Sequence, residues 1–279
     1  MSYSTKSNMK KGLFIGTSGW SYKNDWKDIF YHSASSMMQQ YFSYFDTAEI
    51  NSSFYSLPSG KVVASLRDNL SDNKFFTAKL PKTVTHENRL RVSGEDGLIL
   101  DTFLEQMRPL QVKIESLLIQ LPPWAIDSMG DLESFLSALD HSFRYAIEFR
   151  HESWLSSSVW NLLEKYQIAH CIVDEPKLTI EPRVTTDFSY IRWHGHGEDI
   201  WYRYCYRLEE LETWTPIIHQ LQEQTDTILG YFNNHFFGYA PFNALQMLQL
   251  LEMINPKQQL KLERMTRALS HQQASLDNF

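Results

Sequence analysis

The run YAIEFR at residues 145–150 is a short apolar segment that ends in charged residues. Its first five residues, Tyr145–Phe149, predict a strand, because β-branched and aromatic side chains favour extended backbone. Seven further runs of this kind recur along the chain, at Gly12–Thr17, Thr47–Asn51, Phe75–Lys79, Ser116–Leu121, His170–Asp174, Tyr190–His194 and Thr227–Phe232.

Segments with helical periodicity separate these runs. The clearest are Leu208–Leu221 and Phe242–Ile254, and Asp101–Val112 and Leu132–Leu139 have the same spacing of apolar residues. Strands that alternate with helices form βαβ units and a parallel sheet. Eight right-handed crossovers close naturally into a barrel. The sequence therefore predicts an α/β fold, a (β/α)₈ TIM-type barrel with parallel strands.

An open doubly wound sheet is the rival architecture. It usually has a GxGxxG phosphate turn after the first strand, and Gly16-Thr17-Ser18-Gly19 does not match that pattern. The length of 279 residues suits one barrel, which takes about 250 residues. We therefore expect a single α/β barrel domain at residues 12–269, a flexible N-terminal segment at 1–11 and a loosely ordered tail at 270–279.

The composition limits the classes of function. Hydrophobic residues make up 43% of the chain, which fits an ordered globular protein. The net charge of −7 argues against general nucleic-acid binding, which relies on basic surface. Two cysteines, Cys171 and Cys205, do not make a disulfide framework, and Cys171 is interpreted as a core residue. With neither a signal peptide nor a long apolar segment in the sequence, we expect a cytoplasmic protein without membrane association.

Side chains alternate along a strand, so every second residue faces the lumen of a barrel. Apolar residues are expected to face the helices, which includes Cys171 and Val173 on the sixth predicted strand. The facing of Asn233, Asn234 and His235 after the last strand stays open. The rule then places these polar residues at or near the barrel mouth, where barrel enzymes carry their chemistry: Glu49, Asn51, Thr77, Lys79, Gln120, Glu148, Arg150, Asp174, Tyr190, Arg192 and His194.

Each of these residues also has a structural interpretation. Glu148 and Arg150 fit an internal ion pair that closes the lumen as well as they fit a catalytic site. Lys79 fits a salt bridge to Glu49. His194 alone is typical of a buried structural histidine, although Gly195 after it would allow a ligand to approach the backbone.

Several motifs lie at or after the predicted strand ends. They are GTSGWSY (16–22) with Trp26 and Phe30-Tyr31, EINSSFY (49–55) with LPS (57–59), AKLPK (78–82) with Thr85-His86, QLPP (120–123), EFRH (148–151) with Ser153-Trp154, Asp174, RWHG (192–195) and FNNH (232–235) with Gly238, Ala240, Asn243 and Ala244.

These motifs resemble those of the DUF72 (YecE-like) family. They occur in the family's order and cover nearly the whole chain. The resemblance implies a TIM-barrel-like fold and no assigned activity. Three positions depart from the family pattern, with Asp28 in place of glycine, His32 in place of proline and His196 in place of arginine.

The leading functional hypothesis is an enzyme that uses acid/base chemistry on a small polar or anionic substrate, with a sugar-like compound as one option. Either Glu148 or Glu49 is the candidate general base, and His194 is a candidate proton shuttle. Arg150 and Arg192 are candidates for holding an anionic group. The candidate catalytic residues are Glu49, Lys79, Glu148, Asp174 and His194. The candidate substrate-binding residues are Trp20, Tyr22, Asn51, Gln120, Arg150, Arg192, Asn233 and Asn234.

Two other hypotheses stay open. A divalent-metal-dependent isomerase or phosphodiesterase would draw its ligands from Glu49, Glu148, Asp174, His194 and His235, although no compact metal motif such as HExxH is present. A non-catalytic binder of nucleic acid or of a protein partner would use aromatic residues beside arginines, against the acidic balance of the chain. The sequence contains no motif for an organic cofactor.

Overall fold

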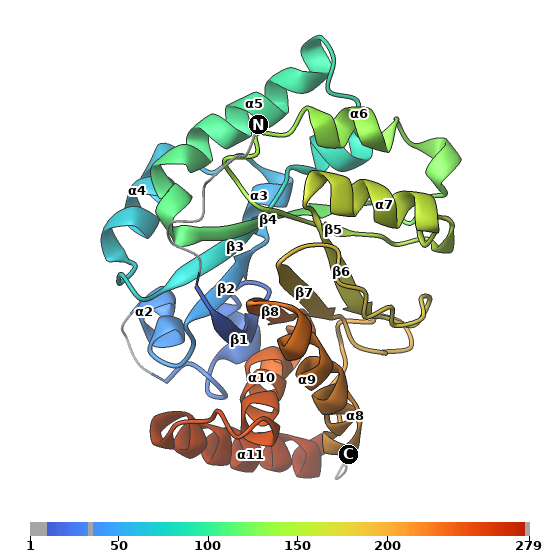
Figure 1. Cartoon of the computed structure of the whole chain (residues 1–279). Coiled ribbons are helices and arrows are strands. Elements are labelled where there is room, and N and C mark those ends of the chain that lie inside the picture. The colour runs from blue at the N-terminus through green and yellow to red at the C-terminus, as the bar shows by residue number, and fades with distance from the viewer. Residues whose placement is uncertain (1–9, 33–35, 277–279) are drawn as a thin grey trace.

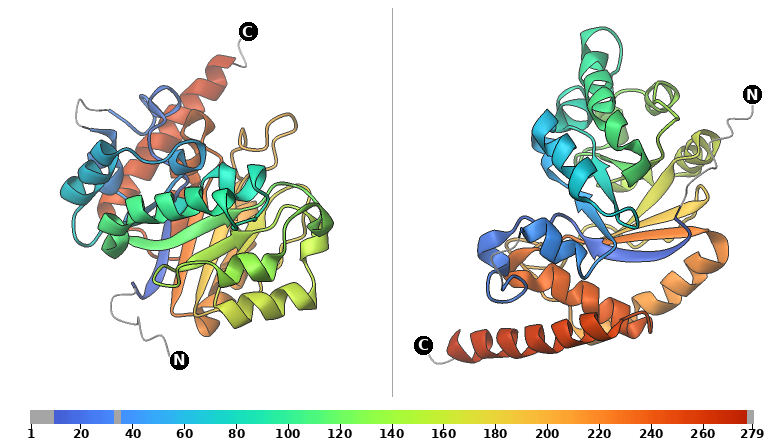
Figure 2. Two further views of the ribbon diagram at one scale, coloured as in Figure 1. Left: turned by 90° about the horizontal axis from the view of Figure 1, so that it is seen from above. Right: turned by 90° about the vertical axis from the view of Figure 1, so that its left-hand side faces the viewer.

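The structure is a computed structural model that describes residues 10–32 and 36–276, with side chains up to residue 271. Eight parallel strands form a (β/α)₈ TIM-type barrel, and helices cover its outside (Figures 1 and 2). This confirms the predicted fold class. The strands are β1 (Gly12–Thr17), β2 (Thr47–Ile50), β3 (Phe75–Lys79), β4 (Ile114–Gln120), β5 (Tyr145–Glu148), β6 (Ala169–Asp174), β7 (Phe188–Trp193) and β8 (Thr227–Phe232).

The helices follow the predicted periodicity, with different boundaries. The predicted helix Leu208–Leu221 is two helices that meet at Thr213, and the predicted helix Asp101–Val112 is an α-helix followed by a 3₁₀ turn that begins just before Pro109. The helices are α1 (Lys23–Trp26), α2 (Met37–Phe42), α3 (Ser52–Tyr55), α4 (Gly60–Asn69), α5 (Glu95–Met107), α6 (Leu132–Ser137), α7 (Ser157–Tyr166), α8 (Leu208–Glu212), α9 (Trp214–Gln224), α10 (Tyr239–Leu250) and α11 (Pro256–Leu276).

The chain ends differ in part from the expected ones. Helix α11 packs against α10 and runs to Leu276, past the boundary expected at Leu269 (Figure 2). Most of the expected N-terminal segment, residues 1–9, and the last three residues lie outside the described part of the chain.

The barrel closes between β1 and β2 without a regular ladder. Hydrogen-bonded neighbours run in the order β1-β8-β7-β6-β5-β4-β3-β2. At the carboxyl ends of β1 and β2, a parallel bridge joins Ser18 to Glu49, and the Gly19 N–H donates to the Glu49 carbonyl at 2.7 Å. A Cβ atom at Gly16 would lie 2.3 Å from the Thr47 carbonyl oxygen, so glycine is needed for the strands to approach this closely.

Tyr41 of α2 seals the same seam with its hydroxyl group. The hydroxyl accepts a hydrogen bond from the Thr17 N–H at 2.8 Å and donates to the Thr47 carbonyl at 2.9 Å. Unpaired buried backbone groups cost free energy, and Tyr41 is fully buried. One phenol thus satisfies a donor and an acceptor that no strand pairs, and it fixes the end of β1, which Ser18 follows, against β2, which carries Glu49.

Alternation along the strands separates two apolar cores. The outer core lies between strands and helices and contains the residues predicted to face outward on β2, β3, β5 and β7, such as Ala48, Phe76, Ile147 and Ile191. The inner core fills the lumen with Phe75, Leu118, Ala146, Ala169, Cys171, Val173, Phe188, Tyr190, Leu229 and Tyr231. The charged residues at the barrel mouth therefore lie directly above the packed apolar side chains that fill the lumen.

The predicted facing of β6 is wrong. Cys171 and Val173 belong to the inner core, whereas Ile172 belongs to the outer core. The register error arises because the lower layers of a barrel lumen are themselves apolar, so apolarity did not distinguish the two faces. Asp174 consequently faces outward, where its carboxylate accepts from Trp214 Nε1 at 3.3 Å. The residue that continues the inward face of β6 is Glu175.

Candidate functional site

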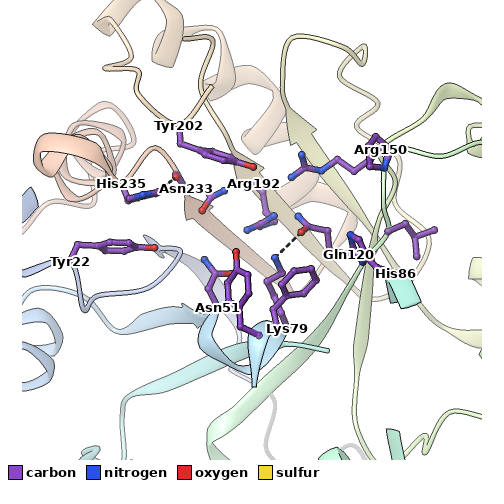
Figure 3. A pocket seen from close by; sticks show the side chains of 14 residues that line it. Tyr22, Asn51, Lys79, His86, Gln120, Arg150, Arg192, Tyr202, Asn233 and His235 are labelled. Atoms are coloured by element: carbon purple, nitrogen blue, oxygen red, sulfur yellow. Dashed lines mark hydrogen bonds between the residues drawn. The ribbon is translucent and has the colours of Figure 1, made fainter. Parts of the chain in front are cut away.

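A cavity of about 480 Å³ opens at the carboxyl ends of the strands (Figure 3). Its charged lining groups are cationic, and neither aspartate nor glutamate lines it in the described part of the chain. Three amide side chains and several aromatic rings complete the wall. The lining residues are Tyr22, Asn51, Phe54, Tyr55, Lys79, His86, Gln120, Leu121, Pro123, Arg150, Arg192, Tyr202, Asn233 and His235.

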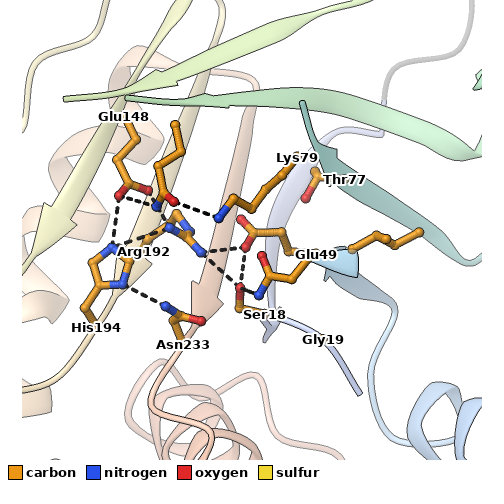
Figure 4. A network of polar contacts seen from close by, with 12 residues as sticks. Ser18, Gly19, Glu49, Thr77, Lys79, Glu148, Arg192, His194 and Asn233 are labelled. Atoms are coloured by element: carbon orange, nitrogen blue, oxygen red, sulfur yellow. Dashed lines mark hydrogen bonds and ion pairs between the residues drawn. The ribbon is translucent and has the colours of Figure 1, made fainter. Parts of the chain in front are cut away.

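Arg192 of β7 forms the floor of this cavity and bridges two carboxylates (Figure 4). One terminal nitrogen donates to Glu148 at 2.5 Å, and the other donates to Glu49 at 2.7 Å. The exposed fraction of the side chain is 1% for Arg192 and 0% for both glutamates. A buried guanidinium between two buried carboxylates fixes β2, β5 and β7 relative to one another.

The Glu148 carboxylate accepts hydrogen bonds from several neighbouring strands and loops. Gln120 Nε2 donates at 2.7 Å, Arg150 Nε donates to the same oxygen, and His194 Nε2 lies 3.3 Å from it. Burial alone would raise the pKa of Glu148, but the charges of Arg150 and Arg192 hold it well below the ordinary value. Glu148 therefore stays ionised and orients two arginines.

Glu49 is held in a similar way. Its carboxylate accepts hydrogen bonds from Ser18, from Arg192 and, at 2.6 Å, from the Tyr190 hydroxyl. Asn51 Nδ2 donates to Ser18 Oγ at 2.7 Å, which ties the β2 loop to the β1 loop. The predicted inward facing of Glu49 and Asn51 is confirmed, and the contacts of Glu49 make it part of the floor.

His194 lies beneath the arginines as a neutral ring. Its Nε2 atom is 3.1 Å from Arg150 and its Nδ1 atom is 3.0 Å from the Asn233 amide. Burial and the charge of Arg150 lower the pKa of His194 to about 3. The neutral imidazole thus contacts Arg150 with one ring nitrogen and Asn233 with the other.

Lys79 at the end of β3 differs from the other charged groups of the mouth. Its ammonium group donates to Gln120 Oε1 at 2.7 Å and lies 4.1 Å from the centroid of the Phe54 ring. The ion pairs of the described residues do not include Lys79, so the predicted salt bridge to Glu49 is not formed. Burial and the charge of Arg192 lower its pKa to about 7.

Arg150 reaches the cavity with help from Glu175, which the sequence interpretation missed. Arg150 lies 3.2 Å from Glu175 Oε2 in addition to its contact with Glu148. Burial raises the pKa of Glu175 to about 7 even though Arg150 opposes the shift. Glu175 stands two residues after Val173, so correct facing of β6 would have found it.

Besides Glu49, Glu148 and His194, three more candidate residues do not line the cavity. Asp174 faces Trp214 and His196, as described for β6. Trp20 packs against Tyr41 and Phe42 in the outer core. Asn234 is fully buried beside the cavity wall.

The Asn234 amide donates to the Tyr204 carbonyl at 2.8 Å and to Asn243 Oδ1 at 2.7 Å, so it holds the loop after β7 in place. The neighbouring residues, Asn233 and His235, do line the cavity, and His235 stacks on Tyr22 with ring centroids 4.5 Å apart. This settles the facing that the sequence left open.

Further lining residues come from the loops after β2, β3 and β7. Phe54, Tyr55, His86 and Tyr202 were not among the candidates. Phe54, Tyr55 and His86 belong to loop motifs that carry the family resemblance, so those motifs were the available signal. Strand alternation does not extend into loops, and it could not find them.

The ligand set of the metal hypothesis does not converge. Arg192 occupies Glu49 and Glu148, Asp174 faces outward, and His235 stacks on Tyr22. The described residues contain no group of three or more histidine, cysteine, aspartate or glutamate side chains placed to hold a metal ion. Across residues 10–32 and 36–276, none of the helices has the length and apolarity needed to cross a membrane.

The sequence was compared with models of protein families and with known proteins, and both comparisons found relatives. It matches the model of the family described as "Protein of unknown function DUF72" over residues 14–267. It is similar to the UPF0759 protein YunF of Bacillus subtilis (strain 168), with 26% identity over 274 residues that cover 86% of this chain and 95% of YunF. It is 30% identical to the UPF0759 protein YecE of Escherichia coli (strain K12) over 145 residues, which are 52% of this chain and half of YecE.

Solved structures agree with this assignment. A DUF72 family protein from Thermotoga maritima MSB8 has a TM-score of 0.75 and 29% identity, covering 86% of this chain and 99% of that one. One from Enterococcus faecalis V583, at 22% identity and a TM-score of 0.72, covers 88% and 98% and shares the fold. The chain belongs to the DUF72 family.

Proposed function

We propose that the protein is an enzyme that binds a small anionic substrate at the barrel mouth and transfers protons on it, with Lys79 as the acid/base group. The observation that carries the proposal is the placement of Lys79. It is a buried amine in the cavity wall, and it lacks a carboxylate within 4.0 Å among the described residues. A bound anion would supply the missing counter-charge.

The remaining lining groups support a substrate that is anionic and hydroxylated. Arg150 and Arg192 line the cavity and are held in place by the carboxylates with which they pair. Guanidinium groups bind phosphate and carboxylate through paired donors. Asn51, Gln120 and Asn233 provide amides suited to hydroxyl groups, and aromatic rings cover the sides, as in many sugar-binding sites.

The proposal moves the acid/base role away from the residues that sequence favoured. Glu148 and Glu49 are each paired with an arginine and accept three hydrogen bonds from the described residues, and His194 has a pKa of about 3. A general acid or base works best when its pKa lies near the working pH. Burial and Arg192 bring the pKa of Lys79 to about 7, so this amine exchanges protons in the neutral range.

The binding half of the proposal is tested with inorganic phosphate as the probe. We expect calorimetric titration to give saturable binding that weakens at least tenfold in Lys79→Met, because a hydrogen bond to a charged group contributes about 1.5–3 kcal/mol. Lys82→Met is the matched control, since Lys82 is half exposed and pairs with Glu87 at 3.2 Å outside the cavity. Equal phosphate binding by the wild type and Lys79→Met would refute this half.

The catalytic half is tested by solvent exchange. Hydroxylated carbonyl compounds that carry a phosphate or a carboxylate are incubated with the protein in D₂O, and NMR detects deuterium that enters next to the carbonyl group. We expect exchange catalysed by the wild type and Lys82→Met but not by Lys79→Met. Exchange at the wild-type rate in Lys79→Met, or none with any member of the panel, would show that Lys79 is not an acid/base catalyst of this chemistry.

A further inference from the structure

We propose that the Lys79 amine forms an imine with a small hydroxylated aldehyde or ketone that carries an anionic group. The inference rests on the anion-binding site proposed above and adds a covalent step to it. In this step Lys79 acts as a nucleophile on a carbonyl carbon, which differs from moving protons on an intact substrate.

The surroundings of Lys79 favour a nucleophilic amine. The charged groups that face it are Glu49 of β2, Glu148 and Arg150 at the end of β5, and Arg192 of β7. His86 from the loop after β3 also faces it and is neutral at pH 7, because burial lowers its pKa to about 4. Each of the two carboxylates is already paired with an arginine, so neither stabilises the ammonium form of Lys79 by direct contact. Burial and the arginine charges both favour the neutral amine.

The cavity also has room and partners for a carbonyl substrate. Lys79 projects into the space between Gln120 and Asn51, with Arg192 beside it (Figure 3). Arg150 and Arg192 would hold the anionic group. Asn51 Oδ1 is buried and has no hydrogen-bond partner among the described residues. A hydroxyl group on the substrate would donate to this oxygen, which is why the proposal names a hydroxylated compound.

The step balances without another reactant. The Nζ lone pair forms a bond to the carbonyl carbon, and the carbonyl π electrons move to the oxygen. The two hydrogens of the amine then leave with that oxygen as one water molecule, and the nitrogen–carbon double bond remains. The neutral amine is needed for attack, so a lowered pKa raises the reactive fraction at neutral pH.

Lys261 of α11 provides a control inside the same chain. It is another buried lysine, and burial lowers its pKa to about 8. Its ammonium group, however, donates to the Phe30 carbonyl, lies 4.8 Å from the centroid of the Phe30 ring and does not line the cavity. If a lowered pKa were sufficient, both lysines would react. If the cavity is required, only Lys79 reacts.

The test is reductive trapping followed by peptide mass spectrometry of the full-length protein. Dihydroxyacetone phosphate is the phosphate probe and hydroxypyruvate the carboxylate probe, each added with borohydride at pH 8. Glycerol 3-phosphate and glycerate are their partners without a carbonyl group. We expect at least one carbonyl probe to leave a reduced adduct on Lys79, at least tenfold more abundant than on Lys261. The adduct should be absent in Lys79→Arg and present in Lys82→Met.

The outcomes separate this inference from the proposed function. An adduct spread equally over Lys79, Lys261 and surface lysines would overturn the inference. The inference would also be overturned if the protein binds inorganic phosphate and the probes without a carbonyl group but forms no adduct. In that case the proposed anion site would remain supported without the imine step. If neither adduct nor anion binding is found, both proposals fail. Trapping with only one carbonyl probe identifies phosphate or carboxylate as the preferred anionic group.

Discussion

Arg192 and Lys79 are both buried cations at the mouth of one barrel, and their surroundings differ sharply. Arg192 lies between two glutamates, which also accept hydrogen bonds from Ser18 after β1 and from Gln120 of β4. Lys79 has an amide oxygen and an aromatic ring as its partners. The difference indicates that Arg192, Glu49 and Glu148, at the floor of the cavity, hold the strands of the barrel together. Lys79, in the cavity wall, lacks an anionic partner, which a ligand would supply.

Energetics support this division. Removing one member of a buried ion pair leaves an uncompensated charge and typically costs about 3–5 kcal/mol. A buried charge without a partner already carries its desolvation cost in the folded state. Substitution of floor residues should therefore lower stability, and substitution of Lys79 should spare or raise it.

The largest effect is expected for Arg192→Met. This change leaves Glu49 and Glu148 without their shared cation, so the free energy of unfolding should fall by about 3–5 kcal/mol, measured by urea denaturation at pH 7. The control is Arg144→Met, because Arg144 also bridges two carboxylates, Glu115 and Asp187, but is 26% exposed. Its loss should cost about 1 kcal/mol or less. Equal losses in the two variants would contradict the structural role of the floor.

A smaller effect is expected for Tyr190→Phe. The change keeps the ring in the lumen but removes the donor to Glu49 Oε2, and a hydrogen bond to a charged group is worth about 1.5–3 kcal/mol. Tyr231→Phe is the matched control, because the Tyr231 hydroxyl bonds the neutral Thr47 side chain at 2.8 Å in the same lumen. Its cost should be about 0.5–1.5 kcal/mol. If Tyr231→Phe proves the more costly, Glu49 does not depend on Tyr190.

The sequence predicted the architecture because barrel strands are short, numerous and punctuated by helical periodicity. Alternation also placed Glu49, Lys79, Glu148 and Arg192 correctly, since each stands between two residues of the outer core. It failed for Asp174 because its strand is apolar on both faces, and the lumen accepts Val173 as readily as the helices do.

The sequence alone did not predict which cationic side chain pairs with which carboxylate. Alternation brings Lys79, Glu49 and Glu148 to one end of the barrel but does not say which cation takes which carboxylate. That choice depends on reach and geometry across strands, where the forked guanidinium of Arg192 spans both glutamates at once. Lys79 has one ammonium group, which donates a hydrogen bond to Gln120 instead of pairing with a glutamate. The functional proposal follows from this competition, which only three-dimensional positions resolve.

The smallest change in stability is expected for Lys79→Met at high pH, and its pH dependence tests the unpaired state directly. The folded-state pKa of about 7 lies below the ordinary value of 10.5, so the unfolded chain binds more protons between these two values. The free energy of unfolding of the wild type should therefore rise with pH across this window.

Methionine cannot titrate, so the free energy of unfolding of Lys79→Met should exceed that of the wild type most at pH 7 and below. This difference in stability, the gap between the two proteins, should close toward pH 10.5. Denaturation series of both proteins measure the gap, with Lys82→Met as the variant that should show none. A gap that stays constant from pH 7 to 10 would mean that Lys79 keeps an ordinary pKa, and the contrast with Arg192 would then lose its electrostatic basis.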